Sequence, residues 1–109
     1  MKHIKLLVDD NIIKYDPECS FDGLRQNMKE SVRLTFAFSP EWKNRPKVVS
    51  FQNLAGKEYP PLVLKNKSCI IPAEVLTNPA FKVQIFGKDL NDERIRTTKC
   101  TIYLEGGRV

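Results

Sequence analysis

Short segments in which every second residue is apolar occur along the whole chain. The clearest covers residues 32–38, in which Val32, Leu34, Phe36 and Phe38 alternate with the residues of the opposite face. Such alternation is typical of a β-strand that buries one face and exposes the other. The same alternation recurs in residues 4–8, 49–51, 81–85 and 100–104. The pattern predicts an all-β protein built from antiparallel strands.

Turn-forming residues mark where these strands end. A strand over residues 2–9 ends at Asp9-Asp10-Asn11, a turn-forming cluster, and residues 12–15 are expected to continue it. The strand over 31–38 stops before Pro40, because proline cannot donate to a ladder. Residues 24–30 form at most a short helical turn. Further strands are expected over residues 47–52, 62–64, 81–87 and 94–105, with a polar loop over 88–93.

The segment Cys69-Ile70-Ile71-Pro72-Ala73-Glu74-Val75-Leu76 runs from a strand into a proline. Proline is tolerated in the first turn of a helix, so the segment predicts a short helical turn over residues 72–76 that crosses between sheets. About seven short strands separated by turns favour a two-sheet antiparallel β-sandwich, immunoglobulin-like or jelly-roll-like. We expect one such domain over residues 1–109.

The composition is that of an ordinary globular domain. The chain has 109 residues, of which 41% are hydrophobic and 28% are charged, so one core can form and disorder is not expected. The longest apolar run is far shorter than a membrane helix requires, and Asp9 interrupts the first apolar stretch before a signal peptide is complete. We therefore expect no membrane insertion and synthesis in the cytoplasm.

The net charge of +5 raises the question of nucleic acid as a partner. The basic residues form three small groups, at 43–47, 57–67 and 94–99, and acidic residues such as Glu41, Glu58 and Glu93 lie beside them. Lysine and arginine on exposed strands also discourage aggregation between sheet edges. The charge pattern favours a solvated sheet face, and nucleic acid is not the expected partner.

Residues that carry catalytic or metal chemistry are sparse. The three cysteines, Cys19, Cys69 and Cys100, are odd in number and widely spaced, which excludes a full disulfide framework and favours reduced core residues. His3 is the one histidine and lies near the terminus. The carboxylate pairs Asp9-Asp10 and Asp92-Glu93 lie in turns, and Gly106-Gly107 has no following helix to form a phosphate cradle. We expect no enzyme, no metal and no cofactor.

Three residues are the candidates for a contact surface: Trp42, Arg45 and Tyr59. A lone tryptophan beside charged residues can stack on a sugar or anchor a protein interface, and it can equally occupy the centre of a sandwich core. Tyr59 precedes Pro60-Pro61, which favours an exposed side chain. Core and surface positions stay open for Trp42.

Three segments in order resemble those of a known family: residues 31–38, residues 69–76 with the phrase Ile71-Pro72 followed by Val75-Leu76, and residues 81–87 followed by Arg94-Ile95-Arg96-Thr97-Thr98. Together they resemble small phage and prophage proteins of Gram-positive hosts, similar to the N-terminal domain of the siphophage baseplate upper protein. The resemblance implies a β-sandwich that attaches a receptor-binding device to a tail.

Two functions follow as expectations. The first is a structural or adaptor module of a phage tail or baseplate, which assembles with other tail or baseplate proteins or with itself as a homo-oligomer. The second is a soluble β-sandwich that binds a carbohydrate or a single-stranded nucleic acid by stacking on Trp42 and Tyr59.

Overall fold

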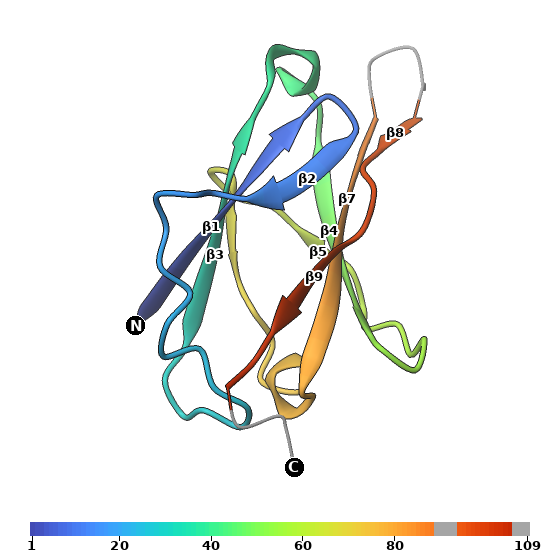
Figure 1. Cartoon of the computed structure of the whole chain (residues 1–109). Helices are drawn as coiled ribbons and strands as arrows, with labels where there is room; N and C mark the ends of the chain where they lie inside the picture. Colours follow the sequence, from blue (N-terminus) through green and yellow to red (C-terminus); the bar gives the residue numbers. More distant parts are fainter. Residues whose placement is uncertain (89–93, 106–109) are drawn as a thin grey trace.

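Two β-sheets pack face to face in the computed structural model, which describes residues 1–88 and 94–105 (Figure 1). The first sheet has the strand order β2-β1-β3-β6, and the second has β5-β4-β7 with β8 and β9 both paired to the far side of β7. The strands are β1 (Lys2–Asp9), β2 (Ile12–Tyr15), β3 (Val32–Phe38), β4 (Lys47–Asn53), β5 (Leu62–Val63), β6 (Ser68–Ile70), β7 (Ala80–Lys88), β8 (Arg94–Arg96) and β9 (Cys100–Tyr103). The predicted two-sheet β-sandwich is confirmed.

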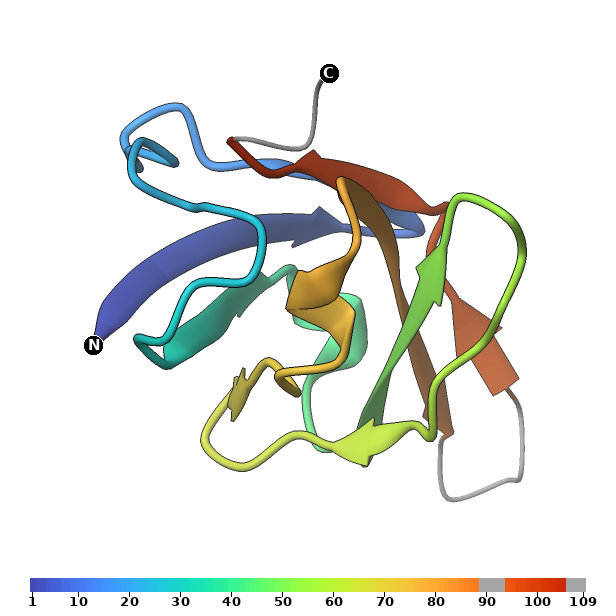
Figure 2. The ribbon, with the colours of Figure 1, turned by 90° about the horizontal axis from the view of Figure 1, so that it is seen from below.

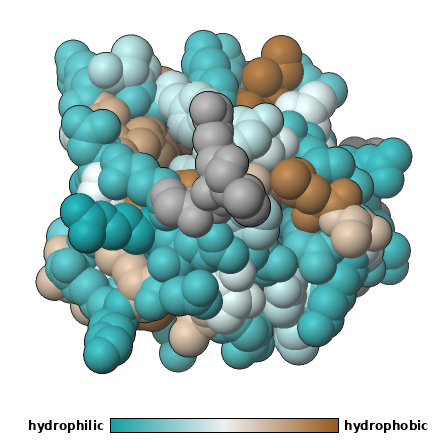
Figure 3. All heavy atoms as spheres, turned by 60° about the horizontal axis from the view of Figure 1, so that its bottom comes forward, coloured by the Kyte–Doolittle hydropathy of each residue, from teal (hydrophilic) through white to brown (hydrophobic). Residues whose placement is uncertain are grey.

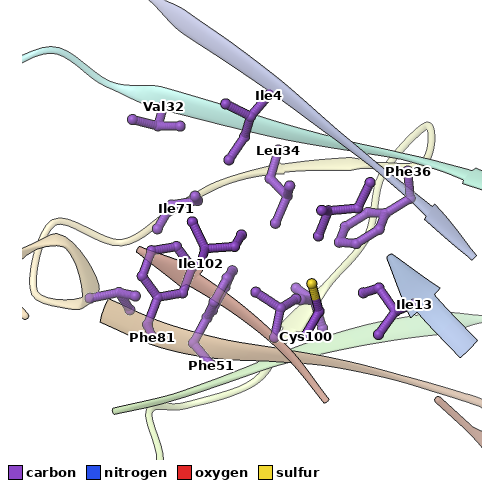
Figure 4. Close-up of a cluster of buried hydrophobic side chains, with 14 of the residues drawn as sticks. Ile4, Ile13, Val32, Leu34, Phe36, Phe51, Ile71, Phe81, Cys100 and Ile102 are labelled. Carbon is purple, nitrogen blue, oxygen red and sulfur yellow. The ribbon is translucent and has the colours of Figure 1, made fainter. Parts of the chain in front are cut away.

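The buried residues of the alternating segments face one another between the sheets. Figure 4 shows Leu34 and Phe36 of the first sheet directed towards Phe51 and Ile102 of the second, and all four side chains are buried. The view from below separates the layers, with β1 and β3 in one and β4 and β7 in the other (Figure 2). The apolar residues of the alternating segments therefore form the core, as the sequence predicts.

The direction of one strand differs from the expected antiparallel arrangement. β1 and β3 run parallel, with Lys2 opposite Val32 and Val8 opposite Phe38. Antiparallel neighbours need only a tight hairpin, whereas a parallel pair needs a connection that returns the chain to the starting end of the sheet. β2, which pairs with β1 as a separate strand, and residues 16–31 supply that return.

The expected strand over residues 94–105 is interrupted and forms β8 and β9. Phe86 pairs with Arg96 and Val83 pairs with Cys100, so the three residues 97–99 lie opposite the two residues 84–85. This is a β-bulge. Thr97 is buried there, and its Oγ1 accepts a hydrogen bond from the Ile85 amide at 3.0 Å. The threonine hydroxyl thus accepts the hydrogen bond that a backbone carbonyl accepts in a regular pair of strands.

Two single turns of 3₁₀-helix lie between strands: η1 (Pro40–Trp42) and η2 (Val75–Thr77). The helical turn predicted near residues 72–76 is confirmed, since the Val75 amide donates to the Pro72 carbonyl at 3.0 Å and the Leu76 amide to the Ala73 carbonyl at 3.1 Å. Val75 and Leu76 are buried.

Residues 24–30 contain turns instead of a helical turn. Residues 89–93 of the expected polar loop, with Asp92-Glu93, and Gly106-Gly107 lie outside the described residues.

Contacts between distant parts of the chain close the sandwich along the edge formed by β2 and β9. The Tyr15 hydroxyl donates to the Thr101 carbonyl, and the Thr98 amide donates to the Asn11 carbonyl at 2.7 Å. Further along, the Glu105 amide donates to the Leu24 carbonyl at 2.8 Å. The first quarter of the chain is therefore bound to its last described residues.

Candidate interaction surface

Trp42 belongs to the core and not to a contact surface. Its side chain is 0% exposed, and its Nε1 donates to the Asp10 carbonyl at 2.6 Å. Pro40 begins η1 and so turns the chain back over the end of the sandwich, where the indole packs beside Phe38 and over Gly87. This answers the question that the sequence left open, and it corrects the assignment of Trp42 to the contact surface.

Tyr59 is buried as well, against the expectation of an exposed ring. It is 8% exposed, its amide donates to the Phe51 carbonyl at 3.0 Å, and its hydroxyl accepts from Asn78 Nδ2 at 2.9 Å. These bonds draw the ring inward before Pro60 turns the chain. Arg45 is half-buried and its Nε donates to the Glu41 carbonyl at 2.8 Å. Trp42 and Tyr59 therefore offer no broad exposed ring face for stacking.

An apolar row instead crosses the outer face of the second sheet. Val63 lies opposite Val48, Val48 lies opposite Phe86, and Phe86 lies opposite Arg96, so one side chain from each of β5, β4, β7 and β8 stands in line. Val63 is 67% exposed and Phe86 is 37% exposed. Directly opposed residues of neighbouring strands have their side chains in contact range. We call this surface the outer-face row.

An open groove of about 580 Å³ follows the outer-face row. The row supplies Val48 and Phe86, and the residues around them are Pro46, Ser50, Glu58, Tyr59, Pro61, Gly87 and Arg94. Tyr59, although almost fully buried, thus borders the groove with its remaining surface. A second hollow of about 300 Å³ adjoins it, shares Phe86, Gly87 and Arg94, and adds Ile95 and Arg96. The groove is therefore apolar at its centre and basic at its β8 end.

A smaller hollow of about 300 Å³ lies on the closing edge of the sandwich, between Tyr15, Phe21, Ile102 and Tyr103. We call it the aromatic hollow. Tyr103 is 71% exposed, and the rings of Tyr15 and Phe21 meet edge to face with centroids 5.0 Å apart. Burial, followed by the neighbouring Cys100 and Tyr103, raises the pKa of Tyr15 above its ordinary value. The Tyr15 hydroxyl donates to the Thr101 carbonyl beside this hollow.

On the face shown in Figure 3, hydrophobic spheres occur in small separate groups among hydrophilic ones. Isolated apolar residues of this kind are normal on a soluble domain, whereas a contiguous patch marks an interaction site. The outer-face row differs from these groups because Val63, Val48 and Phe86 align across three strands, beside Arg96 on a fourth.

The sequence does contain a signal for these surfaces. Along residues 81–86 the inward positions are Phe81, Val83 and Ile85, so Phe86 is an aromatic residue on the outward phase. Val48 beside Val49 and Tyr103 beside Ile102 break the alternation in the same way. Sequence reasoning that searched for isolated aromatic residues in loops missed them, because the informative feature is an apolar residue out of phase with its strand.

The cysteines are free thiols that face the interior to different degrees. Cys100 is buried, and Cys19 and Cys69 are half-buried. Burial raises the pKa of Cys69 to about 11, against a smaller opposite effect of Arg33, and burial also raises the pKa of Cys100. A thiol with a raised pKa is a poor nucleophile and a poor metal ligand at neutral pH.

Within residues 1–88 and 94–105, no three side chains of His, Cys, Asp or Glu come together in a way that could hold a metal ion. The same part of the chain contains no helix long and apolar enough to cross a membrane. That the chain is not an enzyme stays a prediction from the sequence.

Comparison with protein-family models, with curated proteins and with solved structures found no match for this chain. The resemblance to phage baseplate proteins rests on the three sequence segments alone.

Proposed function

We propose that this β-sandwich is a non-enzymatic assembly module that docks another protein chain through the groove along its outer-face row. The observation that carries the proposal is the alignment of Val63, Val48 and Phe86 across three strands, beside Arg96 on a fourth. An apolar centre with a charged rim is the usual anatomy of a protein interface. The rim here comprises Glu58 on one side and Arg94 on the other.

The biological setting that we propose is the tail or baseplate of a phage or prophage of a Gram-positive host. The support for this setting is the order of three short segments in the sequence, which ends with Arg94-Ile95-Arg96-Thr97-Thr98. In that setting the chain would be made in the cytoplasm and incorporated into the virion. Its partners would be other tail or baseplate proteins or further copies of itself.

The alternative function, binding of a carbohydrate or a single-stranded nucleic acid, needs exposed rings on which a sugar or base can stack. The two rings proposed for that role, Trp42 and Tyr59, are buried. A stacked ligand would therefore have to use other rings, such as the exposed rings of Tyr15 and Tyr103 at the aromatic hollow.

The test is selection of a library of random displayed peptides against the whole protein. We expect enriched peptides to bind the wild type and to lose at least about tenfold in affinity with Phe86→Ser, because truncating a central apolar anchor removes much of the binding energy. Leu54→Ser is the matched control, since Leu54 is also an exposed apolar residue but lies in the turn after β4.

Peptides that bind Phe86→Ser and Leu54→Ser equally well would overturn the assignment of this groove. An array of glycans and single-stranded oligonucleotides, probed with the same three proteins, tests the alternative. Binding there that Phe86→Ser abolishes would replace protein docking by ligand binding.

A further inference from the structure

Acidic side chains lie on the segment beside the aromatic hollow. Residues 14–22 contain Asp16, Glu18, Asp22 and Lys14, and two lysines of β1 contact the segment: Lys5 pairs with Asp16, and Lys2 Nζ donates to the Ser20 carbonyl at 3.3 Å. Asp16 is half-buried and pairs with Lys5 at 3.7 Å, whereas Glu18 and Asp22 are exposed. This segment leads directly from Tyr15 through Phe21, which both line the hollow. We call the hollow with residues 16–22 the acidic face.

The β8 end of the groove has the opposite character, whereas Glu58 lines the groove elsewhere. Residues 94–99 contain Arg94, Arg96 and Lys99 and no acid. Arg94 and Arg96 are exposed and line the hollow that adjoins Phe86. The groove therefore has positive charge beside its apolar surface, and the acidic face has negative charge beside its own. The two surfaces are thus complementary in charge, and each offers apolar area to the other.

We infer that the groove receives the acidic face of a second copy of this chain. This inference rests on the proposed function and names the docked partner. Figure 2 places residues 16–22 on the opposite side of the sandwich from β5 and β8, so one molecule cannot satisfy both surfaces by itself. A contact between two different surfaces is heterologous, and it repeats from copy to copy into a ring or a filament. Tyr103 and Phe21 meet Phe86 and Val48, while Glu18 and Asp22 meet Arg94 and Arg96.

Reversal of charge on each surface in turn tests the inference. The first variant carries Arg94→Glu and Arg96→Glu, and the second carries Glu18→Lys and Asp22→Lys. Each variant alone opposes like charges at the contact, so we expect at least about a tenfold loss of self-association. In a mixture of the two variants, the acidic groove of the first variant faces the basic segment of the second variant. The wild-type groove of the second variant likewise faces the wild-type segment of the first variant. Association should therefore return in the mixture.

The measurement is solution mass by light scattering over a range of concentrations, for the wild type, each variant and the mixture. A variant with Lys29→Glu and Lys65→Glu is the control, because both lysines are exposed, lie outside the two surfaces, and change the net charge as much as the groove variant does. The control should associate like the wild type. The variants Phe86→Ser and Tyr103→Ser remove an aromatic side chain without changing the net charge. Each variant should also weaken association.

A wild type that stays monomeric at every concentration would overturn the head-to-tail contact. So would charge variants that keep wild-type association, or a mixture that fails to recover it. These results leave the peptide selection on Phe86→Ser unaffected. A groove that binds peptides in a monomeric protein would thus retain the proposed function and reject the second copy as its occupant.

Discussion

Strand β7 presents two neighbouring residues to opposite environments. Gly87 faces inward, where the nearest atom to an added Cβ would be Cζ3 of Trp42 at 2.8 Å. Phe86 faces outward and is 37% exposed in an open groove. The inner face is filled so closely that only glycine fits, whereas the outer face leaves a large aromatic ring without full cover.

This contrast shows that residue type alone does not separate core from surface positions in this part of the molecule. A tryptophan, which is often an interface anchor, is buried in the core, while a phenylalanine, which is often a core residue, lies at the surface. The side of the strand decides the role. Substitutions on the inner side are therefore expected to change the free energy of unfolding, and substitutions on the outer side to change association.

The largest effect is expected from Trp42→Ala, which should lower the free energy of unfolding by about 3–5 kcal/mol because it leaves a cavity in the core. The same change also leaves the Asp10 carbonyl without its 2.6 Å partner. Phe86→Ser should cost about 1 kcal/mol or less, as substitutions at exposed positions do. Chemical denaturation of both variants measures the difference, and equal losses would remove the contrast between the faces.

Gly87→Ala should destabilise the protein by about 1–3 kcal/mol, because the added methyl group overlaps a buried ring that has little freedom to move. The distance from the added Cβ to Cε3 of Trp42 is 3.1 Å, so two ring atoms must be displaced. Trp42→Leu removes both atoms. In a double-mutant cycle measured by thermal unfolding, Gly87→Ala should therefore cost less in the Trp42→Leu background, and an unchanged cost would contradict the packing argument.

Thr97→Val should cost about 1–2 kcal/mol, because it leaves the buried Ile85 amide without the hydroxyl acceptor at 3.0 Å. The adjacent Thr98 is exposed, so Thr98→Val is the matched control and should be nearly neutral. Urea denaturation of the pair isolates the contribution of the buried hydroxyl in the bulge. Two equal and small effects would show that the bulge does not depend on Thr97.

A further expected effect is a loss of stability at alkaline pH. The pKa values of Cys69 and Cys100 are raised in the folded protein, to about 11 for Cys69. The folded state therefore holds these protons more tightly than the unfolded state, whose thiols titrate near about pH 8.5. The resulting stability is complete below that pH and is lost as the pH rises towards the folded pKa.

Thermal unfolding followed from about pH 8 to about pH 10 measures this loss. The double variant Cys69→Ala, Cys100→Ala should show a shallower decline than the wild type, because it lacks the two thiols whose pKa values are raised in the folded protein. Parallel declines would show that the two thiols do not contribute.

The sequence predicts the part of the fold that depends on local alternation. Residues 32–38 form β3 because their inward side chains are all apolar, and the turn at Pro72 follows from the fixed φ of proline. The parallel pairing of β1 with β3 has no local signal, since it depends on where residues 16–31 return the chain. Tertiary contacts also decide the burial of Trp42 and Tyr59, through partners at Asp10 and Asn78 that are distant in sequence.

The sequence predicts single residues of the candidate site but not their alignment across the sheet. The out-of-phase position of Phe86 is visible in the sequence, but its alignment with Val48 and Val63 depends on the register of β4 with β5 and β7. Register is a property of the assembled sheet and not of any one strand.

The bonds that join the start of the chain to its end have a consequence during protein synthesis. The hydrogen bonds from Tyr15 to Thr101 and from Glu105 to Leu24 cannot form before residues 101 and 105 have been synthesised. The edge of the sandwich therefore stays open until almost all of the described chain has left the ribosome. Contacts between residues so far apart in sequence also make folding slow, on the order of milliseconds to seconds for sandwiches of this kind. During translation, β1 and β2 emerge before the other described strands, and they would remain without the second sheet that covers their apolar side chains.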